Sequence, residues 1–455
     1  MAIEISKEYL ENIEILIRQG RDKDILSLLS EEHPADIAEI IDELNVEDGT
    51  YLVKLLDSEK TAEALLEIDE DDREKILQNL SAEEIADEID EMDTDDAADI
   101  IAELPTERMS EVMSEIEDDE HKKDIVDLLQ YKEGTAGSLM AKELIRVNEN
   151  WTIPKCIKEM RAQANEVTRV HSIYVVDNDN VLKGRLSLKD LLIASSKAHI
   201  SDVYIPKVDF VNVNDKAEEV AQIMQKYDLE AIPVVDDEMH LEGRITIDDI
   251  VDFIKEEAEK DYQMAAGITE DVEADDSILE LIKARLPWLI IALFGGFISV
   301  TILSNFNSAL NKYATLFFFT PLIAATAGNV GVQSSAIVVQ ALANGTLKGS
   351  TWKRLLKEIS MSLINGIILA IILLLVSNFV LDKIIIGFSF KMAITVAISL
   401  ISVIILASLI GTFVPMMLNK RGIDPAVATG PFITTSNDIF GLFIFFYIAK
   451  MILGF

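Results

Sequence analysis

The sequence has few of the residues that most often build cross-links or transition-metal sites. Its single cysteine, Cys156, excludes a disulfide framework within the chain. The five histidines are scattered, and no cysteine–histidine cluster has the spacing of a zinc site. We also find no nucleophile–base constellation and no phosphate-binding glycine loop. These absences argue against a zinc protein and against an enzyme.

Positive charge is scarce in most of the chain. The sequence holds 40 basic and 79 acidic residues, a net charge of −39. Only ten of the basic and four of the acidic residues follow Arg285, so residues 1–285 carry about −45 and the remainder about +6. The acidic part therefore lacks the clustered lysine and arginine that nucleic acid or anionic lipid requires. Its expected partners are divalent cations, although an acidic surface also serves solubility.

Long hydrophobic runs are missing before Leu286, and residues 1–30 are too charged for a secretory signal peptide. Each apolar run beyond that point is long enough to cross a hydrocarbon core, which needs roughly 20 residues. The sequence therefore predicts five membrane spans, near residues 286–304, 314–343, 361–381, 392–418 and 431–454.

The loops between the spans predict the orientation. If the acidic part is cytoplasmic, eight basic residues flank the spans inside and four outside, which satisfies the positive-inside rule. The inner residues are Lys283, Arg285, Lys348, Lys353, Arg354, Lys357, Lys420 and Arg421, and the outer ones are Lys312, Lys383, Lys391 and Lys450. We expect a multi-pass plasma-membrane protein, in bacteria of the inner membrane, with its large N-terminal part in the cytoplasm.

Residues 1–134 have the pattern of short amphipathic helices with an internal repeat. The segment 36–44 resembles 96–104, and 85–92 is a looser copy. Ser81 and Glu84 fit a capping box that opens one of these helices. Stacked helical hairpins, a small α-solenoid with an acidic outer face, are the predicted result.

Residues 135–254 contain a clearer repeat, because 173–192 aligns without gaps on 232–251. Each copy has a β-branched strand, an Asp-rich turn, a second strand after Gly-Arg, and a helix. This α/β pattern resembles a tandem pair of CBS modules. Some CBS pairs bind adenine nucleotides, so ATP is a possible ligand, and a purely dimerising role stays equally open. A charged connector that we expect to be helical follows, over residues 255–284.

Asp438 lies in the last predicted span, where a carboxylate at the bilayer centre costs about 2.5–3.5 kcal/mol on insertion scales. Its neighbours at helical spacing, Gly430, Thr434 and Gly441, are small or carry a hydroxyl and share its face. A pore lining with a cation site explains this pattern. The alternative is a protonated or amide-bonded aspartate buried between helices.

The second predicted span carries a further polar stripe. Thr326, Asn329 and Gln333 fall on one helical face, beside Gly328 and Gly331. Amides in hydrocarbon need partners, which a hydrated pore or the Asp438 helix would supply. Interhelical packing explains any one of these residues equally well. Pro321 and Pro431 would each free a backbone carbonyl if they interrupted a helix.

The chemistry of these side chains favours a hard cation. One carboxylate among hydroxyls and amides, without thiolate or imidazole, indicates magnesium or calcium rather than zinc or copper. Magnesium keeps its waters and needs few direct ligands, whereas calcium prefers more ligands than this stretch offers.

The whole chain resembles the MgtE family of bacterial magnesium channels. The resemblance rests on the order of the parts and on two membrane motifs, Gly-Asn-x-Gly-x-Gln at 328–333 and Asp-Pro-Ala…Thr-Thr-x-Asn-Asp at 424–438. It implies a homodimer with a pore on its two-fold axis and a hydrated Mg²⁺ at Asp438. Together with the two polar stripes described above, these motifs predict Thr434, Asn437, Gly328, Asn329 and Gln333 as pore-lining residues.

The resemblance also implies that intracellular Mg²⁺ closes the pore by bridging the N domain, the CBS pair and the connector, which acts as a plug. The matching acids are Asp95, Asp99, Glu218, Asp228, Asp249, Asp252, Glu257, Asp261 and Asp424. We therefore expect a Mg²⁺ uptake channel in residues 285–455, closed by Mg²⁺ on its acidic cytosolic domains. A CBS-regulated divalent-cation exchanger, with a proton or sodium ion carried at Asp438, is the alternative.

Overall fold

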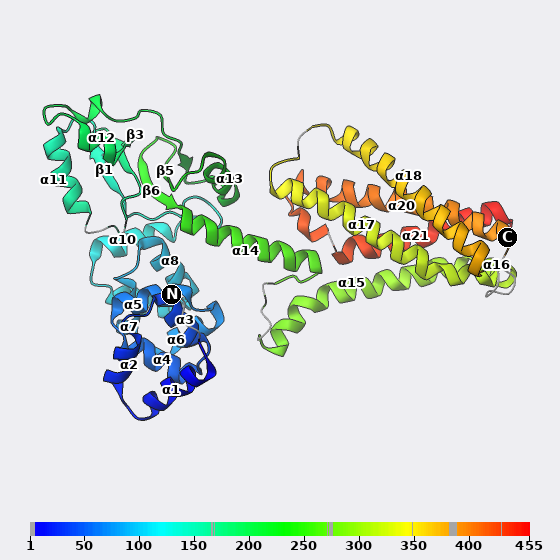
Figure 1. Ribbon diagram of the computed structural model, residues 1–455, viewed down its shortest axis with the longest axis horizontal. Coiled ribbons are helices and arrows are strands. Elements are labelled where there is room, and N and C mark those ends of the chain that lie inside the picture. The colour runs from blue at the N-terminus through cyan, green and yellow to red at the C-terminus, as the bar shows by residue number, and fades with distance from the viewer. Residues whose placement is uncertain are drawn as a thin grey trace. The chain divides into compact units, whose positions relative to one another are not determined.

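The computed structural model describes residues 5–455 apart from 165, 166, 168, 271, 273–275, 348, 382–388 and 429. Lys348 and Lys383, two of the predicted flanking charges, lie outside the described residues. The chain forms two compact units, Met1–Ile254 and Lys255–Phe455. Their elements are labelled in Figure 1.

From Lys7 to Leu128, the described residues of the first unit form ten short helices, as the amphipathic pattern predicts. Alternate helices pack on one another in a small solenoid (Figure 1). Their isoleucines and leucines form its core. Ser81 and Glu84 form the predicted capping box at one helix start. The helices are α1 (Lys7–Arg18), α2 (Asp22–Leu29), α3 (Pro34–Asp42), α4 (Val46–Leu55), α5 (Ser58–Glu67), α6 (Glu70–Asn79), α7 (Ala82–Ile89), α8 (Thr94–Glu103), α9 (Thr106–Glu115) and α10 (Asp119–Leu128).

The two sequence repeats of the CBS region form two small sheets of the same topology. In each sheet the first strand pairs in parallel with the middle strand, which pairs antiparallel with the third. The strands are β1 (Ile145–Asn148), β2 (Ile173–Val176), β3 (Leu182–Leu186), β4 (Val211–Asn212), β5 (Ala231–Val235) and β6 (Leu241–Thr246). The helices are α11 (Ile153–Gln163), α12 (Leu188–Ile193), the 3₁₀ helix η1 (Ile200–Asp202), α13 (Ala217–Tyr227) and α14 (Ile247–Ala266).

Helix α14 corrects the predicted connector. It starts inside the second CBS repeat and continues without a break to Ala266, so the CBS helix and the connector are one element. Gly267 follows with a φ of +87°, a conformation that glycine adopts at low cost and that ends helices. Of the segment 255–284 that was expected to be one helix, only 255–266 belongs to α14, and a new helix begins at Ile278.

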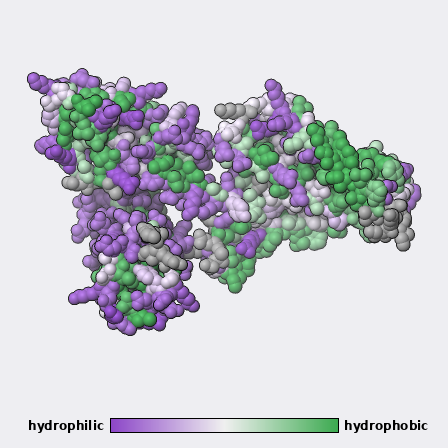
Figure 2. All heavy atoms as spheres, in the orientation of Figure 1, coloured by the Kyte–Doolittle hydropathy of each residue, from purple (hydrophilic) through white to green (hydrophobic). Residues whose placement is uncertain are grey.

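Among its described residues, the second unit contains five helices long and apolar enough to span a membrane, in agreement with the predicted spans. Hydrophobic side chains cover much of their visible surface, whereas hydrophilic ones cover most of the first unit (Figure 2). Pro321 and Pro431 lie in the first turns of their helices and interrupt neither, so they free no backbone carbonyl in the way considered above. The elements are α15 (Ile278–Asn305), α16 (Asn307–Lys312), η2 (Ala314–Phe319), α17 (Thr320–Ala343), α18 (Thr351–Val376), the π-helical η3 (Ser377–Leu381), α20 (Phe390–Asn419), η4 (Pro425–Ala428) and α21 (Gly430–Leu453).

Candidate functional site

A cavity of about 440 Å³ lies between α15 and α21 in the membrane unit. Helix α21 contributes Asp438, the carboxylate that the sequence singled out, together with the hydroxyls of Thr434 and Thr435. Helix α15 contributes Ser299 and two glycines that keep its side of the cavity open. The cavity therefore surrounds one carboxylate with hydroxyl oxygens and small residues, a donor set that suits a hard cation.

Helical periodicity places these groups in the cavity. Gly430, Thr434 and Asp438 follow one another at intervals of four residues, so they lie on one face of α21. The Thr434 hydroxyl donates to the Gly430 carbonyl at 2.9 Å. Gly441, the fourth residue of the predicted face, does not line the cavity and packs beside Val403 and Ala327.

Asn437 is turned away from this cavity, although it is the neighbour of Asp438. It is buried against α17, where its Nδ2 donates to the Ala327 carbonyl at 3.3 Å. Gly331 allows this contact, because a Cβ there would clash with the Asn437 amide. Gly328 lies one turn away, where a Cβ would stand 3.3 Å from the Thr434 methyl group. In the protomer, Asn437 and Gly328 thus pack α17 against α21 and do not line the cavity.

The two remaining pore-lining predictions, Asn329 and Gln333, lie on the exposed face of α17. Neither lines the cavity. Their position matters because an amide that faces lipid has no hydrogen-bonding partner.

The last turn of α14 closes on the inner end of the cavity. Ala266 lines it, and a Cβ at Gly430 would collide with the carbonyl of Ala265. Asp261, one turn earlier on α14, has its pKa raised by partial burial and by the negative charge of Asp424. Two of the predicted regulatory acids, Asp261 and Asp424, therefore repel each other at this inner end.

A second candidate site joins the helical part of the first unit to its CBS pair. Carboxylate oxygens of Asp93, Asp95 and Glu143 lie within 4.8 Å of one another. Glu143 accepts hydrogen bonds from the backbone and the side chain of Thr94, at 3.2 and 2.9 Å. Asp249 belongs to the same electrostatic group, since it contributes to the pKa shift of Asp95. The Asp249 carboxylate accepts a hydrogen bond from the Thr246 hydroxyl at 2.7 Å.

The charges of this acid cluster are poorly compensated. Burial, reinforced by Asp96 and Asp249, raises the pKa of Asp95 well above its usual range. Burial and the Asp249 charge raise the pKa of Asp96 to about 7. Buried Arg244 supplies positive charge to the cluster, because its guanidinium lies 3.4 Å from an Asp93 carboxylate oxygen. A divalent ion bound here would relieve the remaining repulsion.

The other predicted regulatory acids lie outside this cluster. Asp99 is exposed on α8 and adds to the charge around Asp96. Glu218 and Asp228 are exposed on α13 and at its C-cap. Asp252 and Glu257 lie on α14, and a Glu257 oxygen is 3.9 Å from the Lys260 ammonium. Sequence reasoning missed Asp93, Asp96 and Glu143. Asp93 and Asp96 flank the predicted Asp95, whereas Glu143 carried no local signal.

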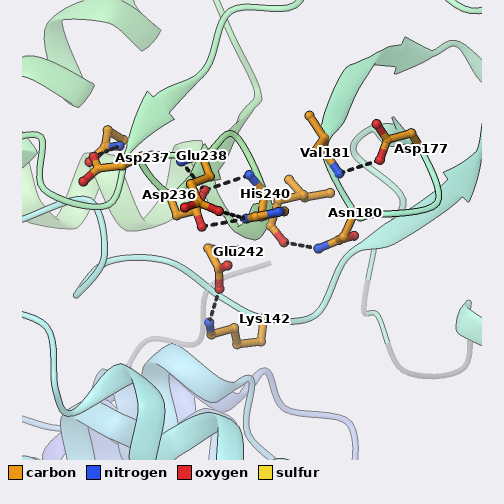
Figure 3. A network of polar contacts seen from close by, with 11 residues as sticks. Lys142, Asp177, Asn180, Val181, Asp236, Asp237, Glu238, His240 and Glu242 are labelled. Atoms are coloured by element: carbon orange, nitrogen blue, oxygen red, sulfur yellow. Dashed lines mark hydrogen bonds and ion pairs between the residues drawn. The ribbon is translucent and has the colours of Figure 1, made fainter.

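The two CBS repeats are joined where the turns of their hairpins meet (Figure 3). Val181 and His240 pair as an isolated antiparallel bridge, and the Asn180 amide donates to the Leu241 carbonyl at 2.9 Å. The hydrogen bond to Asp236 raises the pKa of the His240 imidazole. Nearby, the Lys142 ammonium forms ion pairs with Glu242 at 3.4 Å and with Asp127 of α10 at 2.7 Å. These ion pairs connect the CBS pair to the solenoid.

Comparison with protein families accounts for all three parts. Residues 320–448 match the MgtE model, described as a divalent cation transporter, and residues 32–134 match the MgtE intracellular N domain. CBS domains match 136–197 and 200–256. The magnesium transporter MgtE of Thermus thermophilus is 33% identical over 442 residues, which are 96% of this chain and 97% of that protein. The chain belongs to the MgtE family of magnesium transporters.

Further MgtE proteins agree with this assignment. The magnesium transporter MgtE of Enterococcus faecalis is 37% identical over 333 residues, 73% of this chain and 72% of that protein. A crystal structure of the cytosolic domain of the Mg²⁺ channel MgtE in complex with ATP covers 54% of this chain and 99% of that one. It is 30% identical and gives a TM-score of 0.51. The predicted architecture of solenoid, CBS pair and five membrane helices is thus confirmed, with the soluble part cytoplasmic.

Proposed function

We propose that this MgtE protein is a magnesium-selective channel for Mg²⁺ uptake, closed when intracellular Mg²⁺ binds its cytosolic acids. The observation that carries the proposal is the cavity beside Asp438, with the end of α14 at its inner mouth. The ion is the cargo, and Asp438 holds it. The inside-negative potential drives entry with about 2.3 kcal/mol per charge per 100 mV.

The hydroxyls around Asp438 suit a hydrated ion. Magnesium dehydrates reluctantly, so outer-shell acceptors such as Thr434, Thr435 and Ser299 would bind its water molecules while Asp438 supplies the charge. A smaller, drier site would have to remove those waters. The glycines on α15 leave the space that the hydration shell needs.

We infer a homodimer from the polar face of α17. Asn329 and Gln333 are exposed in the protomer although they lie within a membrane-spanning helix. Unpaired amides in hydrocarbon are costly, and a second protomer or the water of a shared pore would satisfy them. A two-fold arrangement would also bring two Asp438 carboxylates to one axis.

The acid clusters supply the regulation in this proposal. Mg²⁺ that binds between Asp95, Glu143 and Asp249 would hold the solenoid on the CBS pair and so fix α14. A further ion between Asp261 and Asp424 would hold the end of α14 at the inner mouth. Binding that prefers the closed state stabilises it by RT ln(1 + [L]/Kd) at each site. Several sites together reach the roughly 5.5 kcal/mol that moves a gate from mostly open to mostly closed.

The CBS pair is the expected binding site for an adenine nucleotide, which would tune the same closure. Support comes from the related cytosolic domain that was crystallised with ATP. Calorimetric titration of the full-length protein with ATP, with and without Mg²⁺, measures this binding directly.

The decisive experiment measures Mg²⁺ flux into vesicles that hold the parent protein, Asp438→Ala or Asp438→Asn. The asparagine variant keeps the size of the side chain and removes its charge. Both should lose at least about tenfold in flux, which corresponds to the loss of roughly 1.4 kcal/mol of ion stabilisation. An alanine variant that conducts Mg²⁺ as well as the parent, with the same ion preference, would refute the proposal. A current that flows without any counter-ion would exclude the exchanger.

A further inference from the structure

A basic patch lies at the cytoplasmic ends of α18 and α20, in a protein whose net charge is −39. We define the patch as Lys353, Arg354, Lys357, Lys420, Arg421 and Trp352. The Lys420 ammonium lies 3.4 Å from the Thr351 hydroxyl and so joins the end of α20 to the start of α18. None of the five cations forms an ion pair with a carboxylate in the part of the chain that the structure describes.

The described acids that lie nearest to the patch in sequence accept hydrogen bonds from other groups. Glu358 follows Lys357 directly, but its carboxylate accepts the Ser334 hydroxyl of α17 at 2.6 Å. Asp424 follows Arg421 at a distance of three residues, and its Oδ1 accepts the backbone N–H of Ala426 at 2.7 Å. The patch thus gathers five positive charges that form no ion pair with these two acids.

The position of the patch in the membrane indicates what neutralises it. Lys353, Arg354 and Lys357 lie in the first two turns of a spanning helix whose first turn holds no acidic residue. Trp352 beside them is 71% exposed, and exposed tryptophans at the end of a span sit at the level of the lipid headgroups. Four of the five cations are exposed, and Arg354 is half-buried.

We propose that this patch binds the headgroup of an anionic phospholipid in the cytoplasmic leaflet. Clusters of four to eight basic residues directly inside a membrane span bind anionic lipid in this way. The lysine and arginine stems lie along the apolar helix surface while their charged ends reach the phosphate. The acidic residues 1–254 are the competing partner, but they would not account for a tryptophan placed at headgroup depth.

The test uses Trp352 as a reporter of the lipid beside it. The full-length protein, with Trp288→Phe to remove the other membrane tryptophan, is reconstituted with brominated phosphatidylglycerol or brominated phosphatidylcholine, both of which quench nearby indole fluorescence. Phosphatidylglycerol should quench Trp352 at the lower mole fraction. Because each basic residue near an anionic surface strengthens binding roughly fivefold, Lys353→Gln/Lys357→Gln should weaken the preference by roughly 25-fold.

The chain offers a matched control in Lys391→Gln/Lys450→Gln, two exposed lysines on the outer side. This control should keep the full preference. Equal quenching of the parent by both lipids would overturn the proposal, and so would a preference that survives Lys353→Gln/Lys357→Gln. Competition by millimolar inorganic phosphate or ATP would assign the patch to a soluble anion instead. If Lys353→Gln/Lys357→Gln changes the Mg²⁺ flux equally in both lipids, the acidic cytosolic unit, and not lipid, is the partner of the patch. None of these readings requires the proposed gating.

Discussion

At the scale of single residues, a neighbour in sequence is a poor guide to surroundings on a helix. Asp438 faces a cavity lined by hydroxyls, whereas Asn437 is buried against Gly331 of α17. Successive residues on a helix differ in direction by about 100°, so one step separates the ion-facing surface from the packing surface. The motif that contains both residues therefore serves two purposes, one chemical and one structural.

Glu88 of α7 is a carboxyl group whose burial destabilises the solenoid at neutral pH. It is 9% exposed, and burial raises its pKa to about 8, with Asp87 and Glu91 adding repulsion. In the unfolded chain the pKa of this carboxyl group is near its ordinary value of 4.5. The folded state therefore holds the proton more tightly, and stability is lost as the pH rises from about 4.5 to about 8. The loss is at most about 1.4 kcal/mol for each pH unit.

We expect Glu88→Gln to remove this pH dependence. In the full-length protein, amide hydrogen exchange of α7 should be slower in the variant at pH 8, and the two proteins should converge toward pH 5. Glu83→Gln, an exposed change on the same helix, should leave α7 exchange unchanged at both pH values. A parent protein whose α7 protection does not fall between pH 5 and pH 8 would contradict the assigned pKa.

At the scale of the elements, the sequence predicted those features that depend on local spacing. The five spans, the capping box at Ser81 and the face that joins Thr434 to Asp438 follow from periods and caps within one segment. The pairing of Glu143 with Asp93 was not predictable, because about 50 residues separate them and no periodicity links them. The true end of α14 had a signal, Gly267, but the charged sequence beyond it continued to favour helix.

A polar contact connects helices α17 and α18 inside the membrane unit. The Ser334 hydroxyl donates to Glu358 at 2.6 Å, beside Gly411, whose missing side chain lets α20 approach Gly331. Helix α17 also holds Asn437 and therefore the orientation of α21. The contact thus acts on the ion pathway through the position of α17.

Glu358→Gln should retain this contact, because the amide oxygen still accepts from Ser334. Glu358→Leu should lose it and lower the stability of the detergent-purified protein by about 1–2 kcal/mol, with a matching loss of Mg²⁺ flux. Thermal unfolding and vesicle flux measure the two effects. If Gln and Leu fail equally, the negative charge of Glu358 matters and the hydrogen bond does not.

At the scale of the whole molecule, the uneven charge distribution gives the proposed gate its energy. Residues 1–285 carry about −45, and several of their acids are brought together with little compensation. Divalent ions bound at particular sites would convert this repulsion into attraction, whereas general screening by salt acts on every exposed acid alike. The two effects can be separated because the chain offers acids of both kinds.

We expect Asp249→Asn/Asp252→Asn/Glu257→Gln/Asp261→Asn to keep the channel open at Mg²⁺ concentrations that close the parent. If the four acids contribute sites, half-closure should require at least about tenfold more Mg²⁺ on the cytosolic side, as measured by patch currents. The matched control also removes four negative charges, but from exposed positions of the solenoid: Glu11→Gln/Glu31→Gln/Glu59→Gln/Glu63→Gln. Gating by discrete sites predicts normal closure in this control, because net repulsion falls by the same amount in both variants and only the sites differ. Equal shifts in the two variants would show that bulk charge, and not bound Mg²⁺ at α14, sets the gate.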